Sequence, residues 1–339
     1  MFRNTLSSLA KSNFRFTKLN PTNSHKFNYT PTLRSYATYR RFNNQVSNTN
    51  LLKDPKSRRY VLAFLSISGL IYVSNLHEAP VTGRKRFIWT PVWLEEKIGN
   101  QSYRQLLNQY NQQGQILPAS HPTTKKVASI FKRILDVSPV NADQLDWKIH
   151  VIVDPNAPPN AFVLPGGKVF VFSSILSICQ NDDGLATVLS HEFAHQLARH
   201  TGENLSSSPI YGMIGLFLYT VTGSDLINRL IMNAIFTMPA SRQMETEADY
   251  IGLMLMSKAC FNPSESYKLW ERMAQYEKQK SSGMLRAEFL STHPSSDTRI
   301  ENMKEWQSKA RQAYDQSHCE QFGQFWGDNG VPGVRIGLF

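Results

Sequence analysis

The hydrophobic pattern changes its period along the chain, and each change predicts a different element. Residues 147–153 (WKIHVIV) alternate in the manner of a half-buried strand. Residues 160–172 (NAFVLPGGKVFVF) predict two short strands around a Pro-Gly-Gly turn. Asn181 and two aspartates then supply a cap and first-turn acids for a helix with apolar residues at helical spacing. The pattern predicts an α+β, mostly helical fold with a small β-sheet edge beside this helix.

An uncharged stretch near the N-terminus predicts a single transmembrane anchor. Residues 60–76 (YVLAFLSISGLIYVSNL) would span about 25 Å as a helix, the short end of what crosses a bilayer. A buried core helix is the alternative. Two later apolar segments, 210–221 and 226–238, are too short for a second span, which leaves core packing or shallow membrane contact. Pro239 is expected to stop the second segment, with a fresh helix from about residue 241 to 258.

Charge is concentrated at the start of the chain. The formal net charge is +11, but residues 1–53 carry nine Lys or Arg and no Asp or Glu, which leaves +2 for the rest. A nucleic-acid partner is therefore not expected, because a basic binding surface would lie on the folded body. Residues 1–53 are also rich in Ser, Thr and Asn, which is typical of a mitochondrial presequence. An ordinary disordered basic segment is the alternative.

The three cysteines are too few and too scattered for a cysteine-ligated zinc or a disulfide scaffold, since no CxxC pair occurs. Cys179 lies in an apolar stretch and is expected to be a buried thiol. We predict that Cys260 and Cys319 can form a disulfide, because both are near predicted helix ends. Spacing alone leaves three unpaired thiols as the alternative.

The predicted helix after Asn181 carries a metal-binding pattern, HEFAH. His191 and His195 are four residues apart, so their imidazoles lie on one helix face and reach a single metal ion. Glu192 points to the neighbouring sector, beside the metal without ligating it, which suits a general base. The pattern predicts one zinc ion per chain and hydrolysis of a peptide bond.

A catalytic zinc needs a third protein ligand, and the segment METEADYIGL supplies one. Glu245, Asp249 and Gly252 fall on one helix face. We predict that Glu245 binds zinc, that Asp249 accepts a hydrogen bond from a ligating histidine, and that Gly252 lets the two helices approach closely. Glu247 is expected to be a surface charge, and His200 a helix-end residue near the C-terminal dipole.

Taken together, HEFAH, ETEAD, NAFVLPGG and THPSSDTRI resemble the gluzincin superfamily of CAAX prenyl proteases and bacterial HtpX. The presequence, the anchor and EAPVTGRKR narrow the resemblance to the mitochondrial inner-membrane Oma-type metalloendopeptidases. The resemblance implies zinc bound by His191, His195 and Glu245, with Glu192 as the catalytic base.

Three further site residues follow from the resemblance. His293 and Arg299 match the C-terminal motif near the family's cleft, His293 as a donor to the oxyanion and Arg299 as a substrate-binding residue. Asn160 lies on the expected substrate-binding edge strand and is a candidate donor to the substrate backbone. The alternatives are a structural histidine for His293 and an Asx turn for Asn160.

The sequence predicts four regions: a presequence or disordered basic segment at 1–53, an anchor at 60–76, a metalloprotease domain at 85–315 and a C-terminal tail at 316–339. The resemblance implies cleavage of inner-membrane proteins in stress response and quality control, with the catalytic domain in the intermembrane space. Substrates and the lipid bilayer are the expected partners, and assembly into a homo-oligomer is left open. Alternatives are a soluble matrix metallopeptidase and a non-catalytic membrane scaffold with a structural zinc.

Overall fold

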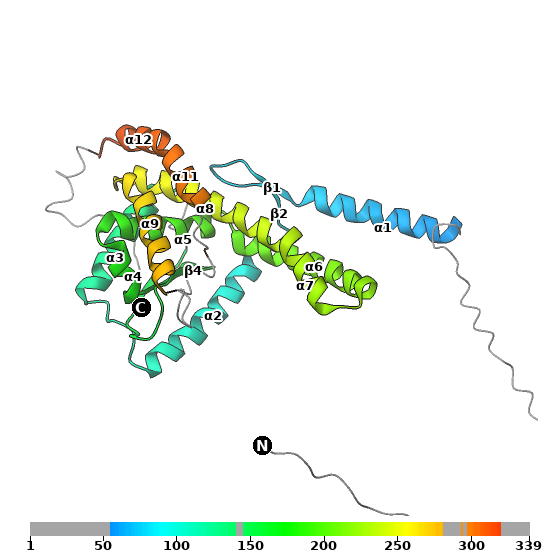
Figure 1. Cartoon of the computed structure of the whole chain (residues 1–339), viewed down its shortest axis with the longest axis horizontal. Coiled ribbons are helices and arrows are strands. Elements are labelled where there is room, and N and C mark those ends of the chain that lie inside the picture. The colour runs from blue at the N-terminus through cyan, green and yellow to red at the C-terminus, as the bar shows by residue number, and fades with distance from the viewer. Residues whose placement is uncertain (1–54, 140–144, 281–292, 294–296, 320–339) are drawn as a thin grey trace, which may run out of the picture. The chain divides into compact units, whose positions relative to one another are not determined.

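The computed structural model describes residues 55–139, 145–280, 293 and 297–319 (Figure 1). The chain divides into two units, 1–60 and 61–339, and only residues 55–60 of the first are described. The predicted presequence and the part of the predicted tail after Cys319 lie outside the described residues.

Helices dominate the described chain, and strands are few and short. The first part contains α1 (Pro55–Ser74), β1 (Leu76–Glu78), β2 (Lys85–Phe87), α2 (Val92–Gln112), α3 (Pro122–Asp136), β3 (Lys148–Ile152), β4 (Ala161–Leu164), β5 (Lys168–Phe172) and α4 (Ser173–Cys179). The second part contains α5 (Asp182–Leu197), α6 (His200–Thr222), α7 (Asp225–Met232), the π-helix η2 (Asn233–Thr237), α8 (Met238–Lys258), α9 (Ser264–Lys280), α11 (Asp297–Glu305) and α12 (Gln307–Gln316). This composition confirms the predicted α+β, mostly helical class.

The strands after residue 147 form one three-stranded sheet in the order β3-β5-β4. β5 pairs parallel with β3 and antiparallel with β4. The predicted hairpin is confirmed, and its turn uses Gly166 and Gly167 at φ of 89° and 82°, which side chains rarely allow. β4 is therefore an edge strand that packs against α5.

The sheet is a middle layer between helices because alternate side chains of its strands point to opposite faces. One face packs against α2 through a cluster around Ile152, Phe170 and Phe172. The other face joins the main core, which is shared with α3 and α5 and includes Ile149, Val151, Val169 and Val171. The sheet thereby supports α5, the helix that carries HEFAH.

Helices α5 and α8 pack closely, as the sequence predicts (Figure 1). Asn181 caps α5, where its side chain accepts a hydrogen bond from the Gly184 N–H at 2.7 Å. A Cβ atom on residue 252 of α8, in place of the glycine hydrogen, would lie 3.0 Å from the backbone nitrogen of His191. Only glycine therefore fits this close approach without displacing the α5 backbone.

The predicted membrane anchor forms a helix, α1, and this helix has no buried residue. No helix in the described ranges is both long enough and apolar enough to cross a membrane. The uncharged part of α1 begins only at Tyr60, directly after Arg58 and Arg59.

The segment from α6 to α8 differs from the prediction in two ways. Core packing, one of the two alternatives for its apolar residues, is wrong, because both α6 and α7 expose large apolar side chains. Pro239 does not stop the chain's helical course either: η2 leads directly into α8, with Pro239 in its first turn. Proline is tolerated in the first turn of a helix, and here the wider π-helix η2 precedes it.

The predicted disulfide is confirmed: Cys260, just after α8, bonds to Cys319 at the end of α12. Cys179 is a buried free thiol, and burial raises its pKa to about 12. The disulfide therefore fastens the C-terminal helices to the helix that carries Glu245.

We expect Cys319→Ser to lower the free energy of unfolding by about 4 kcal/mol in the chain-entropy model, because the bond closes a loop between residues 59 apart. Urea denaturation under non-reducing conditions measures this loss. Cys260→Ser and the double variant serve as controls and should give the same value, since all three remove one bond. Labelling of both thiols without prior reduction would contradict the bond.

Candidate metal centre

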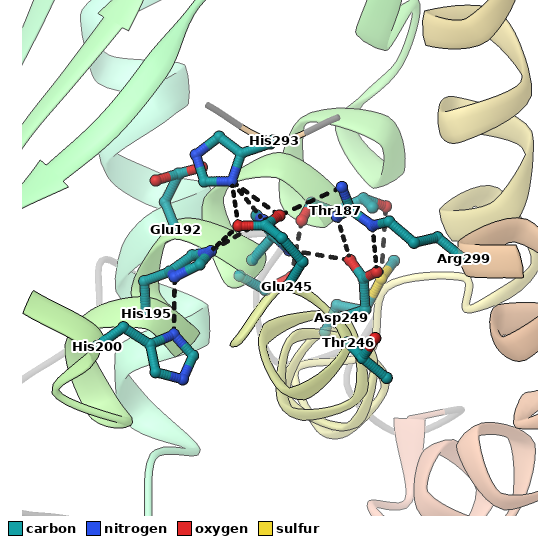
Figure 2. A network of polar contacts seen from close by, with 12 residues as sticks. Thr187, Glu192, His195, His200, Glu245, Thr246, Asp249, His293 and Arg299 are labelled. Carbon is teal, nitrogen blue, oxygen red and sulfur yellow. Dashed lines mark hydrogen bonds and ion pairs between the residues drawn. The ribbon is translucent and has the colours of Figure 1, made fainter. Parts of the chain in front are cut away.

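Two helices bring the predicted metal ligands together (Figure 2). His191 and His195 lie one turn apart on α5, and Glu245 approaches them from α8. The ligand atoms of these three residues and of His293 lie within 4.8 Å of one another. Glu192, by contrast, is not in this group. The structure thus assembles the predicted ligand set from two packed helices, with the predicted base beside it.

The spacing of the ligand atoms suits a tetrahedral ion. The Nε2 atoms of His191 and His195 are 3.2 Å apart, and each is 3.4 Å from an oxygen of Glu245. Ligands at the usual zinc distance of about 2.0–2.1 Å would be about 3.3 Å apart at tetrahedral angles. Asp249 lies 3.0 Å from Nδ1 of His191, and Nδ1 of His200 lies 2.8 Å from Nδ1 of His195, so Nε2 is the atom that each imidazole offers to an ion. The donor set and its geometry fit zinc.

His191 is oriented from behind by a buried ion pair. Its Nδ1 is 3.0 Å from Oδ1 of Asp249, and Asp249 pairs with the guanidinium of Arg299 at 2.6 Å. Burial opposes the charge on His191, but Asp249 and Glu245 outweigh it and raise its pKa to about 9. A metal ligand must be deprotonated, so zinc bound here would displace a proton from this imidazole.

The other two ligands are electrostatically suited to a cation. Burial lowers the pKa of His195 well below its usual value, which favours the neutral imidazole that metals bind. Burial would raise the pKa of Glu245, but hydrogen bonds with His191 and His293 outweigh it and hold that pKa far below its usual value. One neutral nitrogen ligand and one carboxylate are thus available at neutral pH.

Glu192 has the environment of a general base. It is 4% exposed, and burial raises the pKa of its carboxyl. Its Oε1 accepts no hydrogen bond within the described ranges, and Nε2 of His293 lies 3.5 Å from it. A buried carboxylate with a raised pKa and a free acceptor can take a proton from water.

His293 lies closer to the ligands than the sequence indicates. Its Nδ1 is 2.9 Å from Oε2 of Glu245 and 3.3 Å from Nε2 of His191. The imidazole therefore stands where a fourth ligand would stand, and next to the predicted base. A catalytic zinc keeps one position open, so a fourth protein ligand would close the site. The role as oxyanion donor stays a prediction.

The remaining predicted site residues are placed differently. Arg299 is buried, and its guanidinium contacts Asp249, Glu245 and the Trp270 ring, so it supports the ligands from behind. Its role in substrate binding stays a prediction. Asn160 precedes β4 and is 7% exposed, and its carbonyl accepts a hydrogen bond from the Phe172 N–H. The proposed donation from its side chain also stays a prediction.

Two expectations about neighbouring residues are wrong. Glu247 is not a surface charge but is 5% exposed and bonded to His200, Arg84 and Thr82. Burial would raise the pKa of Glu247, but these bonds outweigh it and lower the pKa to about 2. His200 does not end the catalytic helix, because α5 ends at Leu197 and His200 begins α6.

A signal for Glu247 was present in the sequence. The α8 helix carries three acidic residues within one and a half turns among apolar residues. The argument that a buried carboxylate needs a partner applies to each of the three. No local pattern identified the partners, because Arg84 lies more than 160 residues away in the chain.

Residues 121–307 match peptidase family M48. The chain is 54% identical over 302 residues to the mitochondrial metalloendopeptidase OMA1 of Saccharomyces cerevisiae, covering 85% of this chain and 87% of the relative. It is 40% identical to the protein of the same name from Schizosaccharomyces pombe, over 81% of this chain and 80% of the relative. It is 27% identical to the metalloendopeptidase OMA1 of Homo sapiens, over 75% and 51%. The matched range contains both ligand histidines, Glu192 and Glu245.

Proposed function

The chain belongs to peptidase family M48, and from this premise we propose that it cleaves proteins at the mitochondrial inner membrane, with zinc held by His191, His195 and Glu245. It is a zinc-dependent metalloendopeptidase, and the relatives it resembles are named as mitochondrial. The observation that carries the site assignment is the convergence of three ligand atoms beside a buried carboxylate.

The chain's own residues supply the proton transfers. Zinc, when bound, acts as a Lewis acid on the scissile carbonyl and on the attacking water. Glu192 takes the proton from the water as it attacks and passes it to the leaving amine. His293 donates a hydrogen bond to the oxyanion of the tetrahedral intermediate. Asp249 and Arg299 hold the ligands from behind. No covalent enzyme intermediate forms.

Metal removal tests this assignment. We expect purified chain to contain one zinc ion, to cleave an unfolded protein such as casein, and to lose both zinc and cleavage on dialysis against a chelator. Readdition of zinc should restore cleavage. Full activity in stripped protein would contradict zinc catalysis, and a metal-free variant at His191 with normal activity would contradict the ligand assignment.

Substrate is proposed to add a strand to β4. β4 is the edge of its sheet and packs against α5, so a peptide along it would lie beside the catalytic helix. The Asn160 carbonyl bonds to β5, and the alternation of an antiparallel ladder then turns the N–H and C=O of Ala161 and Val163 away from β5. These outward groups can pair with an extended peptide.

We expect Val163→Pro to raise KM for protein substrates about tenfold, roughly what loss of one or two main-chain hydrogen bonds would cost. Proline removes the outward N–H but not a bond within the sheet, and edge strands tolerate it. Steady-state kinetics with casein measures the effect. Val163→Ala is the matched control and should keep KM near that of the unmodified chain. Equal kinetics of both variants would contradict strand addition.

Membrane association is proposed from the apolar surface. The large apolar side chains exposed on α6, α7 and η2 are Ile210, Met213, Leu216, Phe217, Tyr219, Val221, Leu226, Ile227, Leu230 and Ile235. Soluble monomers rarely expose so many neighbouring apolar side chains without a binding role. We propose that lipid covers them and that the protease lies at the inner membrane. We propose separately, from the resemblance to the mitochondrial relatives, that the catalytic domain is in the intermembrane space.

Flotation with phosphatidylcholine and cardiolipin vesicles tests this proposal. We expect the full chain to float with the vesicles and the double variant Leu216→Gln/Phe217→Gln to float less. Val92→Gln/Trp93→Gln removes an apolar pair of α2 that is also more than half exposed or close to it, and is the control. Failure of the unmodified chain to float would favour the soluble matrix peptidase. Carbonate extraction of mitochondria separates a spanning protein, which stays in the pellet, from a peripheral one.

A further inference from the structure

The ligand His195 has a histidine, not a carboxylate, behind it. Its Nε2 faces the other ligands, and its Nδ1 is 2.8 Å from Nδ1 of His200 (Figure 2). Only one proton can lie between these two nitrogens. A neutral ligating His195 must hold that proton and donate it, which makes His200 the acceptor.

The hydrogen bonds beyond His200 follow the same direction. With Nδ1 as acceptor, His200 carries its proton on Nε2, which is 3.1 Å from Oε2 of Glu247. Glu247 accepts this bond and is the last residue in this series of hydrogen bonds from His195. One proton arrangement therefore satisfies every nitrogen between His195 and Glu247, and it fixes the tautomer and the ring orientation of the ligand.

We propose that His200 and Glu247 are positioning residues for the zinc ligand His195, and that Arg84 ties them to the turn between β1 and β2. The proposal rests on the assignment of His195 as a ligand. It gives this chain a second device for orienting a ligand, separate from the Asp249–Arg299 pair behind His191.

Glu247 accepts hydrogen bonds from two residues that lie more than 160 positions earlier in the sequence. Arg84 donates to Oε2 of Glu247 from Nε at 2.9 Å and from Nη2 at 2.7 Å, and the Thr82 hydroxyl donates to Oε1. Arg84 also pairs with both oxygens of Glu203 on α6, at 2.8 and 2.6 Å. One guanidinium thus fixes two carboxylates on two helices, and buried carboxylates need such pairing.

The break between α5 and α6 makes the contact geometrically possible. In a continuous helix, His200 would lie well around from His195. Arg199 instead adopts a left-handed conformation at φ of 50°, and His200 starts a new helix that returns it to His195. Side chains outside the site hold this corner: Glu95 pairs with Arg199, and the Arg86 guanidinium donates to the Ala198 carbonyl.

The two ligand histidines are therefore oriented by two similar series of contacts. Behind His191 stand Asp249 and then Arg299, from α11. Behind His195 stand His200, Glu247 and then Arg84, from the segment that follows α1. Zinc affinity should consequently depend on side chains far from the metal, on both sides of the site.

Zinc affinity, measured by competition with a chromogenic chelator on the purified full chain, tests the proposal apart from activity. We expect His200→Leu and Glu247→Ala each to weaken zinc binding by about 10–100-fold, as loss of a group behind a metal ligand does. Arg84→Ala should weaken it less, because His200 and Thr82 still contact Glu247. The double variant His200→Leu/Glu247→Ala should bind zinc as tightly as the single variant with the lower affinity, since the two substitutions interrupt the same series of contacts.

Two further variants separate positioning from general damage to the fold. His200→Gln keeps an acceptor for His195 and a donor for Glu247, and should bind zinc at least fivefold more tightly than His200→Leu. His150→Leu removes another buried histidine, which lies on β3 and contacts Tyr103 of α2, and should lower thermal stability without weakening zinc binding.

Three results would overturn the proposal: unchanged zinc affinity in folded His200→Leu, equal weakening in His150→Leu, or additive losses in the double variant. A full chain that binds no zinc at all before mutation would instead contradict the ligand assignment. The two failures are therefore distinguishable.

Discussion

Glu192→Gln is expected to abolish proteolysis while leaving both zinc and fold in place. Glutamine keeps the size of the side chain in its buried position but cannot take a proton. Loss of a positioned general base costs about 10²–10⁴-fold in kcat. Zinc content by metal analysis and kcat on casein decide the outcome together.

The zinc content makes this test specific, because Glu192 lies outside the group of convergent ligand atoms. Glu192→Asp is the control. It keeps a carboxylate base on a shorter side chain, so activity should fall less than in the glutamine variant. Turnover by Glu192→Gln at the rate of the unmodified chain would refute the mechanism. Loss of zinc would show that the carboxylate is a ligand.

The local parts of the site could be predicted because each depends on spacing within one element. His191 and His195 share a helix face at four residues' separation, and Asn181 marks the start of that helix. Gly252 indicated the close approach of α8, which the structure confirms. In each case the sequence separation and the helical period were sufficient.

The prediction failed where the backbone leaves its period or where partners are distant. The helical position of His200 assumed that α5 continues, whereas the left-handed Arg199 ends it. Glu247 can be buried because Arg84, from the turn between β1 and β2, neutralises its charge. The apolar run of α6 matched a core helix by composition, yet it packs with few partners and stays exposed. Tertiary partners, not local propensity, decide these positions.

Glu245→Ala is expected to lose both zinc and activity. Its carboxylate is the only acidic member of the convergent ligand group among the described residues, and alanine leaves that group with imidazoles alone. Zinc binding should fall below detection at micromolar metal, and kcat with it. Competition with a chelator and a casein assay measure both losses on the same preparation.

Asp249→Asn is the graded comparison for Glu245→Ala. It leaves the ligands in place and weakens only the orientation of His191, so zinc affinity should fall by about 10–100-fold. Glu247→Ala should give a loss of similar size, because it acts on His195 through His200. The loss of zinc affinity should therefore be far larger for Glu245→Ala than for Asp249→Asn or Glu247→Ala. If Glu247→Ala loses the metal while Glu245→Ala retains it, the third ligand is wrongly assigned. Substitution of a ligand should weaken zinc binding more than substitution of a residue that only orients a ligand.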